Sequence, residues 1–534
     1  MGEMRGEPGS VTRRLGAASI ALACIVALLT EAPASSKTRS GCAKADHPGG
    51  EWRMYGHDLA NTRTQPKEKK IDASNAATLE PKWVFDATAQ DGVRNGGGFQ
   101  NTPVVADGCL YGSSSTGMVF AINPDNGKLV WATELVGRGG GALIGGVIVG
   151  SPTVQNGMVF VGVSKPGAPY VTALDQATGE ILWRTTVVTT RKFSAVFNAA
   201  PIFVGGMIFQ GWLGVEGSGP TRGGYAILDA SRHCQEQAEV KCSARGAGAR
   251  GGSILEARWT ITDKEYKKGY YGASVWCTAA VDPAQKYIYA CGGNPHSEGK
   301  EARYANSLLK IDGNPRRNTF GDIVDHYKGR PDQYVAGADR QAVCDNFADE
   351  TTVAVWSVGC LMLDLDFGAS PNLFRDQSGR LVLGDLQKAG VYHAVYADHM
   401  APAWQTTVSG PCFSCNATSG AYANGRVFTV GSPAGQLVGI GAKGDNEGRP
   451  EWAYPIADGV HYQSVSTANG VVYLIDGYGN LNMVDAATGV PLMRRPMSVD
   501  VNGSAVDTGS QGIAIARNRV FAASGSFIVS YGLP

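Results

Sequence analysis

The stretch SPTVQNGMVFVG, residues 151–162, consists of two short apolar runs separated by the polar turn Gln-Asn-Gly. The apolar residues include β-branched and aromatic side chains and alternate with a period of two, which is typical of β-strands. A tight turn between two such runs predicts a β-hairpin. Seven further stretches share this pattern, at residues 102–112, 200–211, 279–292, 381–395, 420–431, 466–477 and 512–525.

The regular recurrence of these eight hairpins predicts the fold. Repeated hairpins bury their apolar faces by stacking on their neighbours, and a closed ring keeps the sheet edges short and protected. We therefore predict an all-β fold, an eight-bladed β-propeller, with residues 51–534 as a single domain. About 62 residues are available per blade once residues 1–34 are set aside. A minimal blade needs roughly 40–45, so we expect loop insertions, the largest near residues 217–258 and 314–359.

The composition of the 534-residue chain agrees with a folded, many-turned protein. Lys+Arg and Asp+Glu both number 47, so the formal net charge is zero and no overall basic field is available to bind nucleic acid. Hydrophobic residues make up 43% and charged residues 18%, which argues against disorder. The 72 glycines are spread along the sequence and indicate many tight turns.

The first 34 residues resemble a secretory signal peptide. Arg13 and Arg14 precede an apolar run at residues 15–29, and the small residues Ala32 and Ala34 flank Pro33 at a cleavage-like site. The run is too short for a stable membrane span, and no later segment is long and apolar enough to form one. We expect an exported chain, periplasmic or secreted, in which residues 35–50 form a linker.

The cysteines support an oxidising compartment. Eleven are present, and ten remain without Cys24 of the predicted signal peptide. Cys277 and Cys291 flank a predicted hairpin turn, which would bring them opposite each other. Sequence alone does not fix the connectivity, but closeness along the chain suggests the pairs Cys234–Cys242, Cys277–Cys291, Cys344–Cys360 and Cys412–Cys415, which leaves Cys42 with Cys109.

A tryptophan motif follows two of the hairpins. Asp175-Gln-Ala-Thr-Gly precedes Trp183, and a similar turn precedes Trp131, 52 residues earlier. The turn joins two outer strands, and the indole then packs between adjacent blades. This motif resembles the propeller of the quinoprotein alcohol dehydrogenases. The polyvinyl alcohol dehydrogenase branch has the pattern W-x-M-Y-G-H-D-x-x-N-T-R, which this sequence carries at residues 52–63, and the resemblance covers roughly residues 50–534.

The family resemblance implies a pyrroloquinoline quinone (PQQ) site. The cofactor supplies the redox chemistry, while the protein supplies its position and electrostatics. Trp276, six residues before Asp282, matches the tryptophan that stacks under the quinone. Lys388 matches the cation that bonds the reactive quinone oxygen. Arg222, in the Arg-Gly pair of the third blade, is an implied cofactor contact.

The same resemblance implies a calcium ion and a catalytic base. Glu216, Asn294 and Asp366 occupy the positions of the calcium ligands, and their oxygen atoms suit Ca²⁺ by hardness. Asp366 also matches the carboxylate that removes the alcohol proton. These residues lie far apart in sequence. We expect a ring of blades, which turns successive blade starts toward one axis, to bring them together.

Each of these residues also has an ordinary structural interpretation. Trp276 is compatible with core packing between blades, and Asn294 before a proline is compatible with a turn residue. Glu216 beside glycines is compatible with a solvated loop carboxylate, and Lys388 with an exposed turn lysine. Asp364 is a rival to Asp366 for the catalytic position. The combination of five suitable residues in the expected order favours the functional interpretation.

Two departures from the family pattern are evident. Many relatives hold a pair of adjacent cysteines over the quinone, and this sequence has no adjacent cysteines. The Cys-x-x-Cys pattern at Cys412 and Cys415 is followed by Asn416 rather than histidine, which argues against a covalent haem. Electrons would therefore leave to a separate acceptor such as a cytochrome c.

Together these features predict an exported PQQ- and calcium-dependent dehydrogenase that oxidises an alcohol, and the family resemblance implies a secondary or polymeric alcohol as substrate. The alternative is a propeller without a cofactor that acts as a protein-binding scaffold in the cell envelope, because a fold does not by itself choose a function. The absent cysteine pair favours the scaffold. The filled metal and lysine positions favour the enzyme, since a scaffold gains nothing from buried carboxylates.

Overall fold

Short antiparallel β-strands form eight sheets in the described part of the chain, as the hairpin pattern predicted. The computed structural model describes residues 41–136, 147–297, 300–330, 365–410, 416–432, 434–456, 463–501 and 512–534. The predicted signal peptide lies outside these residues. We number the sheets as blades 1 to 8 in chain order.

The first four blades come from the N-terminal half of the chain. Their strands are β3 (Val104–Ala106), β4 (Cys109–Ser113), β5 (Met118–Ile122) and β6 (Leu129–Glu134) in blade 1; β7 (Thr153–Gln155), β8 (Met158–Val163), β9 (Tyr170–Asp175), β10 (Ile181–Thr186) and the added β15 (Val240–Cys242) in blade 2; β11 (Ala195–Val196), β12 (Ile202–Val204), β13 (Met207–Gly214), β14 (Gly224–Asp229) and β16 (Ile254–Trp259) in blade 3; and β17 (Ala280–Asp282), β18 (Tyr287–Gly292), β19 (Ser307–Asp312) and β20 (Ile323–Lys328) in blade 4.

The remaining blades complete the ring. Their strands are β21 (Asn372–Arg375), β22 (Leu381–Gln387), β23 (Val391–Tyr396) and β24 (Ala401–Thr407) in blade 5; β25 (Ala421–Ala423), β26 (Arg426–Gly431), β27 (Gln436–Gly441) and β28 (Pro450–Pro455) in blade 6; β29 (Ser466–Ala468), β30 (Val471–Ile475), β31 (Asn480–Asp485), β32 (Pro491–Pro496) and the parallel β1 (Thr64–Gln65) in blade 7; and β33 (Ile513–Ala516), β34 (Arg519–Ser524), β35 (Phe527–Gly532) and β2 (Glu80–Asp86) in blade 8. Short helices occur at α1 (Asp263–Lys267), η1 (Ala76–Thr78), η2 (Ala87–Ala89), η5 (Gly444–Asn446) and η6 (Met497–Val499).

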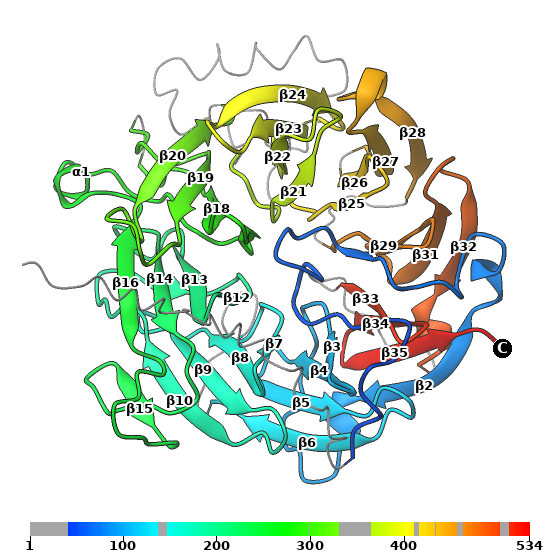
Figure 1. The fold of residues 1–534 in the computed structure, drawn as a ribbon, viewed down its shortest axis with the longest axis horizontal. Coiled ribbons are helices and arrows are strands. Elements are labelled where there is room, and N and C mark those ends of the chain that lie inside the picture. The colour runs from blue at the N-terminus through cyan, green and yellow to red at the C-terminus, as the bar shows by residue number, and fades with distance from the viewer. Residues whose placement is uncertain are drawn as a thin grey trace, which may run out of the picture. The chain divides into compact units, whose positions relative to one another are not determined.

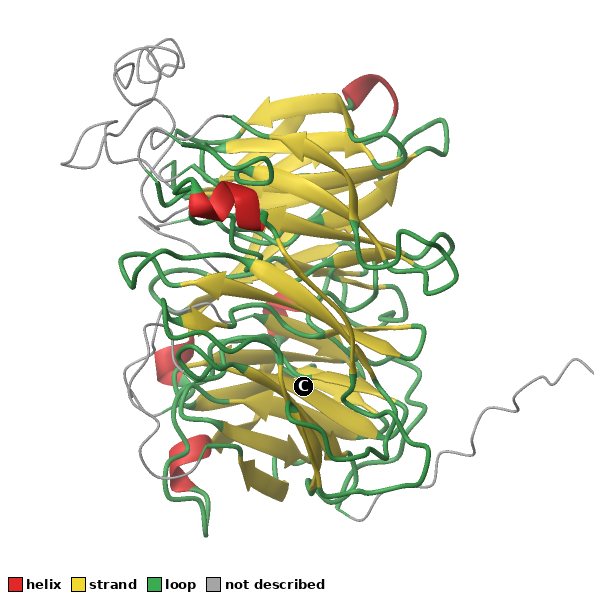
Figure 2. Ribbon diagram, turned by 90° about the vertical axis from the view of Figure 1, so that its left-hand side faces the viewer, coloured by secondary structure: helices red, strands yellow, loops and turns green. Residues whose placement is uncertain are grey.

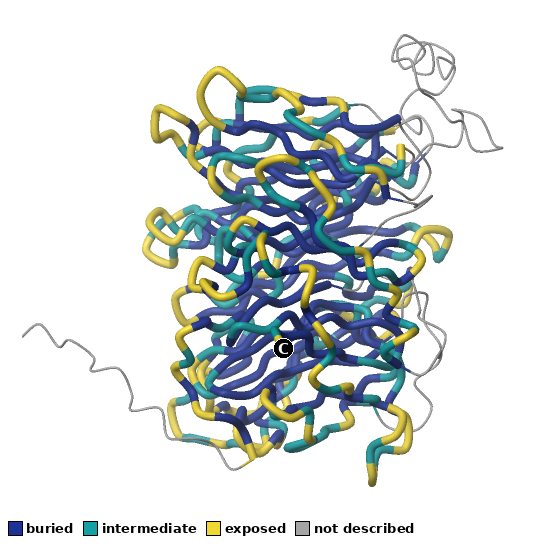
Figure 3. The backbone as a smooth tube through the Cα atoms, turned by 90° about the vertical axis from the view of Figure 1, so that its right-hand side faces the viewer, coloured by how far each residue is buried: buried dark blue, intermediate teal, exposed yellow. Residues whose placement is uncertain are grey.

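The blades stand around a common centre in chain order (Figure 1). Successive first strands contact one another, for example β21 with β25, β25 with β29 and β33 with β3. Blade 8 closes the ring because its outer strand β2 comes from the N-terminal side and pairs with β35 near the C-terminus, with Phe85 opposite Ile528. The strands are largely buried and the exposed residues gather in the loops at the two faces (Figures 2 and 3).

The motif at residues 52–63 belongs to a segment, residues 50–65, that lies across the centre of the ring; we call it the central segment. Its backbone hydrogen-bonds to the first strands of blades 1, 2, 4, 5, 6 and 7 and to the residue that follows the first strand of blade 8, through the pairs Trp52–Val105, Arg53–Val154, Leu59–Val281, Ala60–Leu373, Thr62–Tyr422, Arg63–Thr467 and Gly50–Arg517. The inner edges of the sheets are thereby paired, which satisfies backbone groups that would otherwise be buried without partners.

Tryptophans dock on glycines of the neighbouring blade. The ring of Trp131 lies against Gly179, and its indole N–H donates to the Gln176 carbonyl at 3.3 Å. A Cβ atom on any of the five glycines named below would lie 2.6–3.3 Å from the nearest indole atom, which is closer than an ordinary van der Waals contact. The predicted packing of Trp131 and Trp183 is confirmed, and the full set of pairs is Trp83–Gly127, Trp131–Gly179, Trp183–Gly252, Trp404–Gly448 and Trp452–Gly489.

Three predicted disulfides are confirmed: Cys42–Cys109, Cys234–Cys242 and Cys277–Cys291. The pairs Cys344–Cys360 and Cys412–Cys415 fall outside the described residues. Among the residues that the structure describes, no helix is long and apolar enough to span a membrane.

Two details of the predicted blades are wrong. The stretch at residues 381–395 forms the middle strands β22 and β23, whereas the first hairpin of blade 5 is β21–β22. The turn after β21, in which Asp376 accepts from the Arg380 N–H, is long and polar, so this hairpin does not match the sequence pattern of the others. Residues 217–258 are not one loop either, since they contain β14, β15 and the start of β16, and β15 joins blade 2. The second insertion begins around β20 and continues beyond the described residues.

Candidate active site

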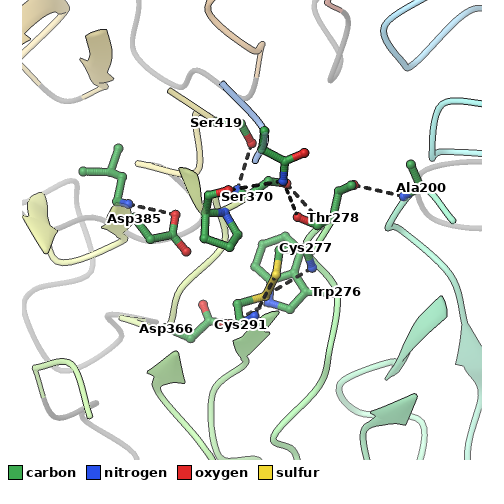
Figure 4. The surroundings of a disulfide bond; sticks show 12 residues. Ala200, Trp276, Cys277, Thr278, Cys291, Asp366, Ser370, Asp385 and Ser419 are labelled. Atoms are coloured by element: carbon green, nitrogen blue, oxygen red, sulfur yellow. Dashed lines mark hydrogen bonds between the residues drawn. A yellow bond between two sulfur atoms is a disulfide. The ribbon is translucent and has the colours of Figure 1, made fainter. Parts of the chain in front are cut away.

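Hydroxyl side chains tie the starts of the first strands together around the centre (Figure 4). The Ala200 N–H donates to Thr278 Oγ1 at 3.0 Å, and the Thr278 N–H donates to Ser370 Oγ at 3.0 Å. The Ser370 N–H donates in turn to Ser419 Oγ at 2.9 Å. Each blade from 3 to 5 therefore bonds to a hydroxyl of the next blade. These bonds fix the residues just before each first strand, where Trp276 lies.

The segments that precede the first strands of blades 1 to 6 line a central cavity of about 90 Å³. Its described lining residues are uncharged and combine hydroxyl and amide groups with small apolar residues and the aromatic rings of Tyr55 and Trp276. Ser151 Oγ and Asn101 Oδ1 are buried there without hydrogen-bond partners, so both atoms are available to a ligand. The lining residues are Tyr55, Gln100, Asn101, Val149, Gly150, Ser151, Asn198, Trp276, Cys277, Thr278, Gly368, Ser370, Ala417 and Ser419.

A larger groove of about 770 Å³ lies elsewhere, at the opposite end of the first strands of blades 6 and 7. The turn residues Asn424 and Asn469 line it, together with part of the central segment. It shares no lining residue with the central cavity. We place the candidate site at the smaller cavity because a buried ionic cluster adjoins it.

Asp366 is the centre of that cluster. Its side chain is 1% exposed and its Oδ1 lies 2.6 Å from Lys388 Nζ. Its Oδ2 accepts from Trp276 Nε1 at 2.9 Å and from the Asn294 N–H at 3.2 Å. Four of the six residues predicted for the site, from blades 4 and 5, are thus brought into contact. A carboxylate with this surrounding of donors is held in one orientation.

Lys388 lies in the turn between β22 and β23, yet it is 5% exposed rather than solvated. Its backbone N–H donates to the Asp366 carbonyl at 3.0 Å, and this bond holds the turn against the segment that precedes β21. The Nζ atom stands 4.8 Å from the centroid of the Trp276 ring, within cation–π range. An ammonium, a carboxylate and an indole therefore share one buried point beside the cavity.

Asn294 follows β18 and is oriented by a residue that the sequence analysis missed. His296 Nε2 lies 3.2 Å from Asn294 Oδ1, and His296 Nδ1 lies 2.5 Å from Thr221 Oγ1. Because Oδ1 only accepts hydrogen bonds, Nε2 carries the proton and Nδ1 accepts from the Thr221 hydroxyl. The Asn294 Nδ2 atom is buried without a hydrogen-bond partner. No pattern in the sequence separates His296 from the other histidines.

Glu216 and Arg222 lie differently from the other four predicted residues. Glu216 follows β13 in an exposed turn. The Arg222 guanidinium donates to the Ile261 carbonyl at 2.6 Å and to Asp263 Oδ1 at 2.7 Å. It also lies over the ring of Trp259. None of these Arg222 contacts lines the cavity, so the structure does not bring Arg222 to the cluster. The rival residue Asp364 falls outside the described residues.

A second buried carboxyl group lies on β22. Asp385 Oδ1 accepts from the Leu386 N–H at 2.9 Å, and Oδ2 is buried without a hydrogen-bond partner. Burial raises the pKa of Asp385 well above its usual range, and the negative charge of Asp366 adds to that effect. An acidic residue inside an otherwise apolar strand was the available sequence signal, and it was overlooked.

Comparisons with known proteins find similar alcohol dehydrogenases. Residues 52–145 match the β-propeller domain of the glucose/ethanol/alcohol dehydrogenase family labelled PQQ. The chain is 25% identical over 361 residues to the dehydrogenase subunit of a quinone-dependent alcohol dehydrogenase of Gluconacetobacter polyoxogenes, covering 63% of this chain and 46% of that protein. It is 24% identical over 430 residues to the polyvinylalcohol dehydrogenase of a Pseudomonas species, covering 76% and 59%.

The chain is thus similar in sequence to quinone-dependent alcohol dehydrogenases over part of its length. It spans about half the length of the curated relatives it matches. The solved quinohemoprotein alcohol dehydrogenase ADHIIG of Pseudomonas putida HK5 superposes with a TM-score of 0.67 at 16% identity, covering 91% of this chain and 80% of that one. A europium-containing methanol dehydrogenase superposes with a TM-score of 0.63 at 15% identity, covering 89% and 90%. These two structures confirm the propeller fold.

The residues around the cavity fit a quinone of this family in chemistry. Trp276 offers an aromatic face, Ser151 offers an unused hydroxyl for a carboxylate, and Lys388 offers a cation. The cavity of about 90 Å³ has room for about three water molecules. A flat quinone is larger than that, so side chains that line the cavity must move to admit it.

Proposed function

We propose that the chain is an alcohol dehydrogenase that uses PQQ and Ca²⁺. The observation that carries this proposal is the contact of Asp366, Lys388 and Trp276 at the wall of the central cavity. A buried ion pair in contact with a residue that lines a cavity is expensive for a scaffold to maintain, because both charges lose their hydration. A redox site needs these groups in this environment.

Each residue has a separate task in the proposed reaction. PQQ, when bound, supplies the redox chemistry by accepting hydride from the alcohol carbon. Trp276 provides the flat surface that holds the ring, and Asp366 accepts the hydroxyl proton. Lys388 keeps a positive charge beside Asp366 and the ring, which favours the carboxylate form of the base.

Calcium is the proposed metal because the available ligands are hard oxygen atoms. Asn294 and Asp366 would each supply an oxygen atom to the ion, and the hydrogen bond from the Asn294 N–H to Asp366 Oδ2 supports this by bringing the two residues together. Glu216 is exposed in this structure and would have to turn inward to complete the set. The ion would polarise the quinone as a Lewis acid.

We also propose export, a substrate class and an acceptor. The signal-peptide pattern supports a periplasmic or secreted enzyme. The relative that acts on polyvinyl alcohol supports a secondary or polymeric alcohol as substrate. A further relative, the 1-butanol dehydrogenase (cytochrome c) of Thauera butanivorans, is 31% identical over 170 residues, covering 32% of this chain and 23% of that protein. It supports a separate cytochrome c as acceptor, since no covalent haem motif is present in the sequence.

Reconstitution tests the proposal directly. Purified apoprotein is titrated with PQQ in the presence of Ca²⁺, and alcohol oxidation is followed by dye reduction. We expect a bound-quinone absorbance and dye reduction, both lost when EDTA removes the ion. Asp366→Asn should abolish oxidation while PQQ still binds, and Glu80→Gln, which alters an exposed ion pair with Lys82, should leave oxidation unchanged. A wild-type protein that binds no PQQ, or an Asp366→Asn variant with full activity, would refute the proposal.

A further inference from the structure

The disulfide Cys277–Cys291 lies beside two of the groups that converge on Asp366 (Figure 4). Cys277 directly follows Trp276, and Cys291 comes three residues before Asn294. Both half-cystines are buried, with exposures of 3% and 0%. The disulfide therefore belongs to the wall of the candidate site rather than to the molecular surface.

The disulfide connects the segment before β17 with the end of β18, beyond the last residues that pair in the sheet. The pairing of β17 with β18 starts at Ala280, opposite Tyr289. Beyond that point the N–H groups of Cys277 and Cys291 each lie near the sulfur of the other, at 3.1 and 2.8 Å. On the other side of Trp276, the Gly293 N–H donates to the Ser274 carbonyl at 2.7 Å. Trp276 is thus held between a covalent bond and a hydrogen bond.

These two segments supply both donors to one oxygen atom. Trp276 Nε1 and the Asn294 N–H both donate to Asp366 Oδ2, which leaves Oδ1 to face Lys388. The spacing between the segments therefore sets the orientation of the carboxylate. The Trp276 ring has little room to move, because it packs so closely on Gly368 that a Cβ there would lie 2.6 Å from the ring.

We propose that the Cys277–Cys291 disulfide is a positioning element for the carboxylate of Asp366. It fixes the distance between the Trp276 and Asn294 segments, so that both N–H groups meet the same oxygen and the other oxygen stays toward Lys388. The importance of this role for catalysis rests on the proposed function, in which Asp366 is the base. The effect of the disulfide on the orientation of the Asp366 carboxylate does not depend on that function.

The chain contains a matched control disulfide. Cys234–Cys242 closes a loop of 8 residues and Cys277–Cys291 a loop of 14, so both remove a comparable amount of chain entropy from the unfolded state. Cys234 and Cys242 lie near β15 in the insertion of blade 3, and neither lines the central cavity. A purely stabilising role predicts similar behaviour for both disulfides.

The first experiment uses the apoprotein and needs no cofactor. The Cys277→Ala/Cys291→Val variant replaces the disulfide by apolar groups, and Cys234→Ala/Cys242→Val is its control. The ¹⁵N–¹H resonance of the Trp276 indole, assigned with Trp276→Phe, reports the hydrogen bond to Asp366. We expect this resonance to shift or broaden in the first variant and to stay unchanged in the control. An unchanged Trp276 resonance in a folded first variant overturns the proposal.

Two further measurements complete the test. If the first variant does not fold, the same resonance is recorded in folded wild type after phosphine reduction, with loss of the Cys277–Cys291 bond verified by mass, and an unchanged signal again overturns the proposal. With PQQ and Ca²⁺, we expect kcat to fall about tenfold or more in the first variant, with KM within about twofold, because a small misplacement of a catalytic group is costly. An inactive wild type would count against the proposed function, while the indole resonance still decides the positioning role.

Discussion

Lys388 Nζ lies 2.6 Å from Asp366 Oδ1, and the two side chains are 6% and 1% exposed. Two strands of blade 5, β21 and β22, lie between these residues in the sequence, so the contact arises from the β21–β22 hairpin and the turn that follows it. In so buried an environment each charge stabilises the other, because a buried charge carries a large desolvation penalty. This pair is the main electrostatic feature of the site.

Replacing Lys388 with methionine should therefore destabilise the protein. The change removes the ammonium group that lies 2.6 Å from the buried Asp366 carboxylate, and we expect a loss of about 3–5 kcal/mol in the free energy of unfolding at pH 7. Urea denaturation measures this loss. Lys82→Met serves as the control, since its ion pair with the 53%-exposed Glu80 should contribute about 1 kcal/mol or less. Equal losses in the two variants would contradict the dependence on burial.

His393 should make the protein sensitive to acid. Its Nε2 lies 2.9 Å from Gln387 Oε1 and its Nδ1 lies 3.0 Å from the Tyr327 hydroxyl. Burial lowers the pKa of His393 to about 3, with Arg330 nearby as a further cause. The unfolded chain binds the proton below about pH 6.5 while the folded chain does not, so stability falls as the pH drops from there toward 3. The loss should approach about 1.4 kcal/mol per pH unit.

The variant His393→Gln removes this dependence while an amide still offers a donor and an acceptor. Between pH 6.5 and 4.5 it should lose about 2–3 kcal/mol less stability than wild type, measured by urea denaturation at each pH. His399→Gln is the control, because His399 is exposed and pairs with exposed Asp398. It should retain the acid sensitivity of the wild type.

Arg63 should be essential for the closure of the ring. It is fully buried and donates to the carbonyls of Val465 and Tyr55 and to the hydroxyls of Thr102 and Ser466. Burial lowers its pKa to about 10, so the side chain remains charged at neutral pH. Arg63→Leu leaves these acceptors unsatisfied and should cost about 3 kcal/mol or more. Thermal unfolding measures this loss.

The comparison for Arg63 is a less buried arginine in the same segment. Arg53 pairs with Glu51 and Asp107 and its side chain is 32% exposed. Arg53→Leu should lower stability by about 1 kcal/mol or less. Arg63→Lys should behave more like Arg63→Leu than like wild type, because a single ammonium cannot reach acceptors that the planar guanidinium contacts together.

Gly368 should tolerate no side chain. A Cβ there would lie 2.6 Å from Trp276 Cη2 and 3.0 Å from the Ala417 side chain. Gly368→Ala should therefore displace the indole, change Trp276 fluorescence and weaken PQQ binding at least about tenfold, since overpacking at such a point costs about 1–3 kcal/mol. Gly98→Ala is the control, because its Cβ would meet nothing closer than 3.5 Å. Tight PQQ binding by Gly368→Ala would show that Trp276 is not the platform.

Local patterns were sufficient for the architecture. Period-two alternation and glycine turns identified seven of the eight first hairpins, and the spacing of Trp131 and Trp183 identified the docking between blades. These features depend on residues close in sequence, where steric preference and hydrophobic alternation act directly. The hairpin of β21 was missed because Asp376 and Arg380 make its turn long and polar.

The site residues were identified by family resemblance, and their arrangement required the ring. Trp276, Asn294, Asp366 and Lys388 span more than 110 residues of sequence, and the contacts among them come from the stacking of blade 4 on blade 5. The burial of Lys388 ran against the usual exposure of turn lysines, since its turn folds back on Asp366. Arg222 was predicted as a cofactor contact, but the structure ties it to Asp263 on α1, a partner 41 residues away.

The sequence by itself determined the repeated strands and the turns and suggested the disulfides Cys234–Cys242 and Cys277–Cys291, because each of these depends on residues that are close along the chain. Only the tertiary structure decided which polar groups are buried and which donors hydrogen-bond to the same oxygen atom. Burial and electrostatic interaction depend on distances in space, and closure of the ring by β2 and β35 sets those distances for residues that the chain order keeps far apart.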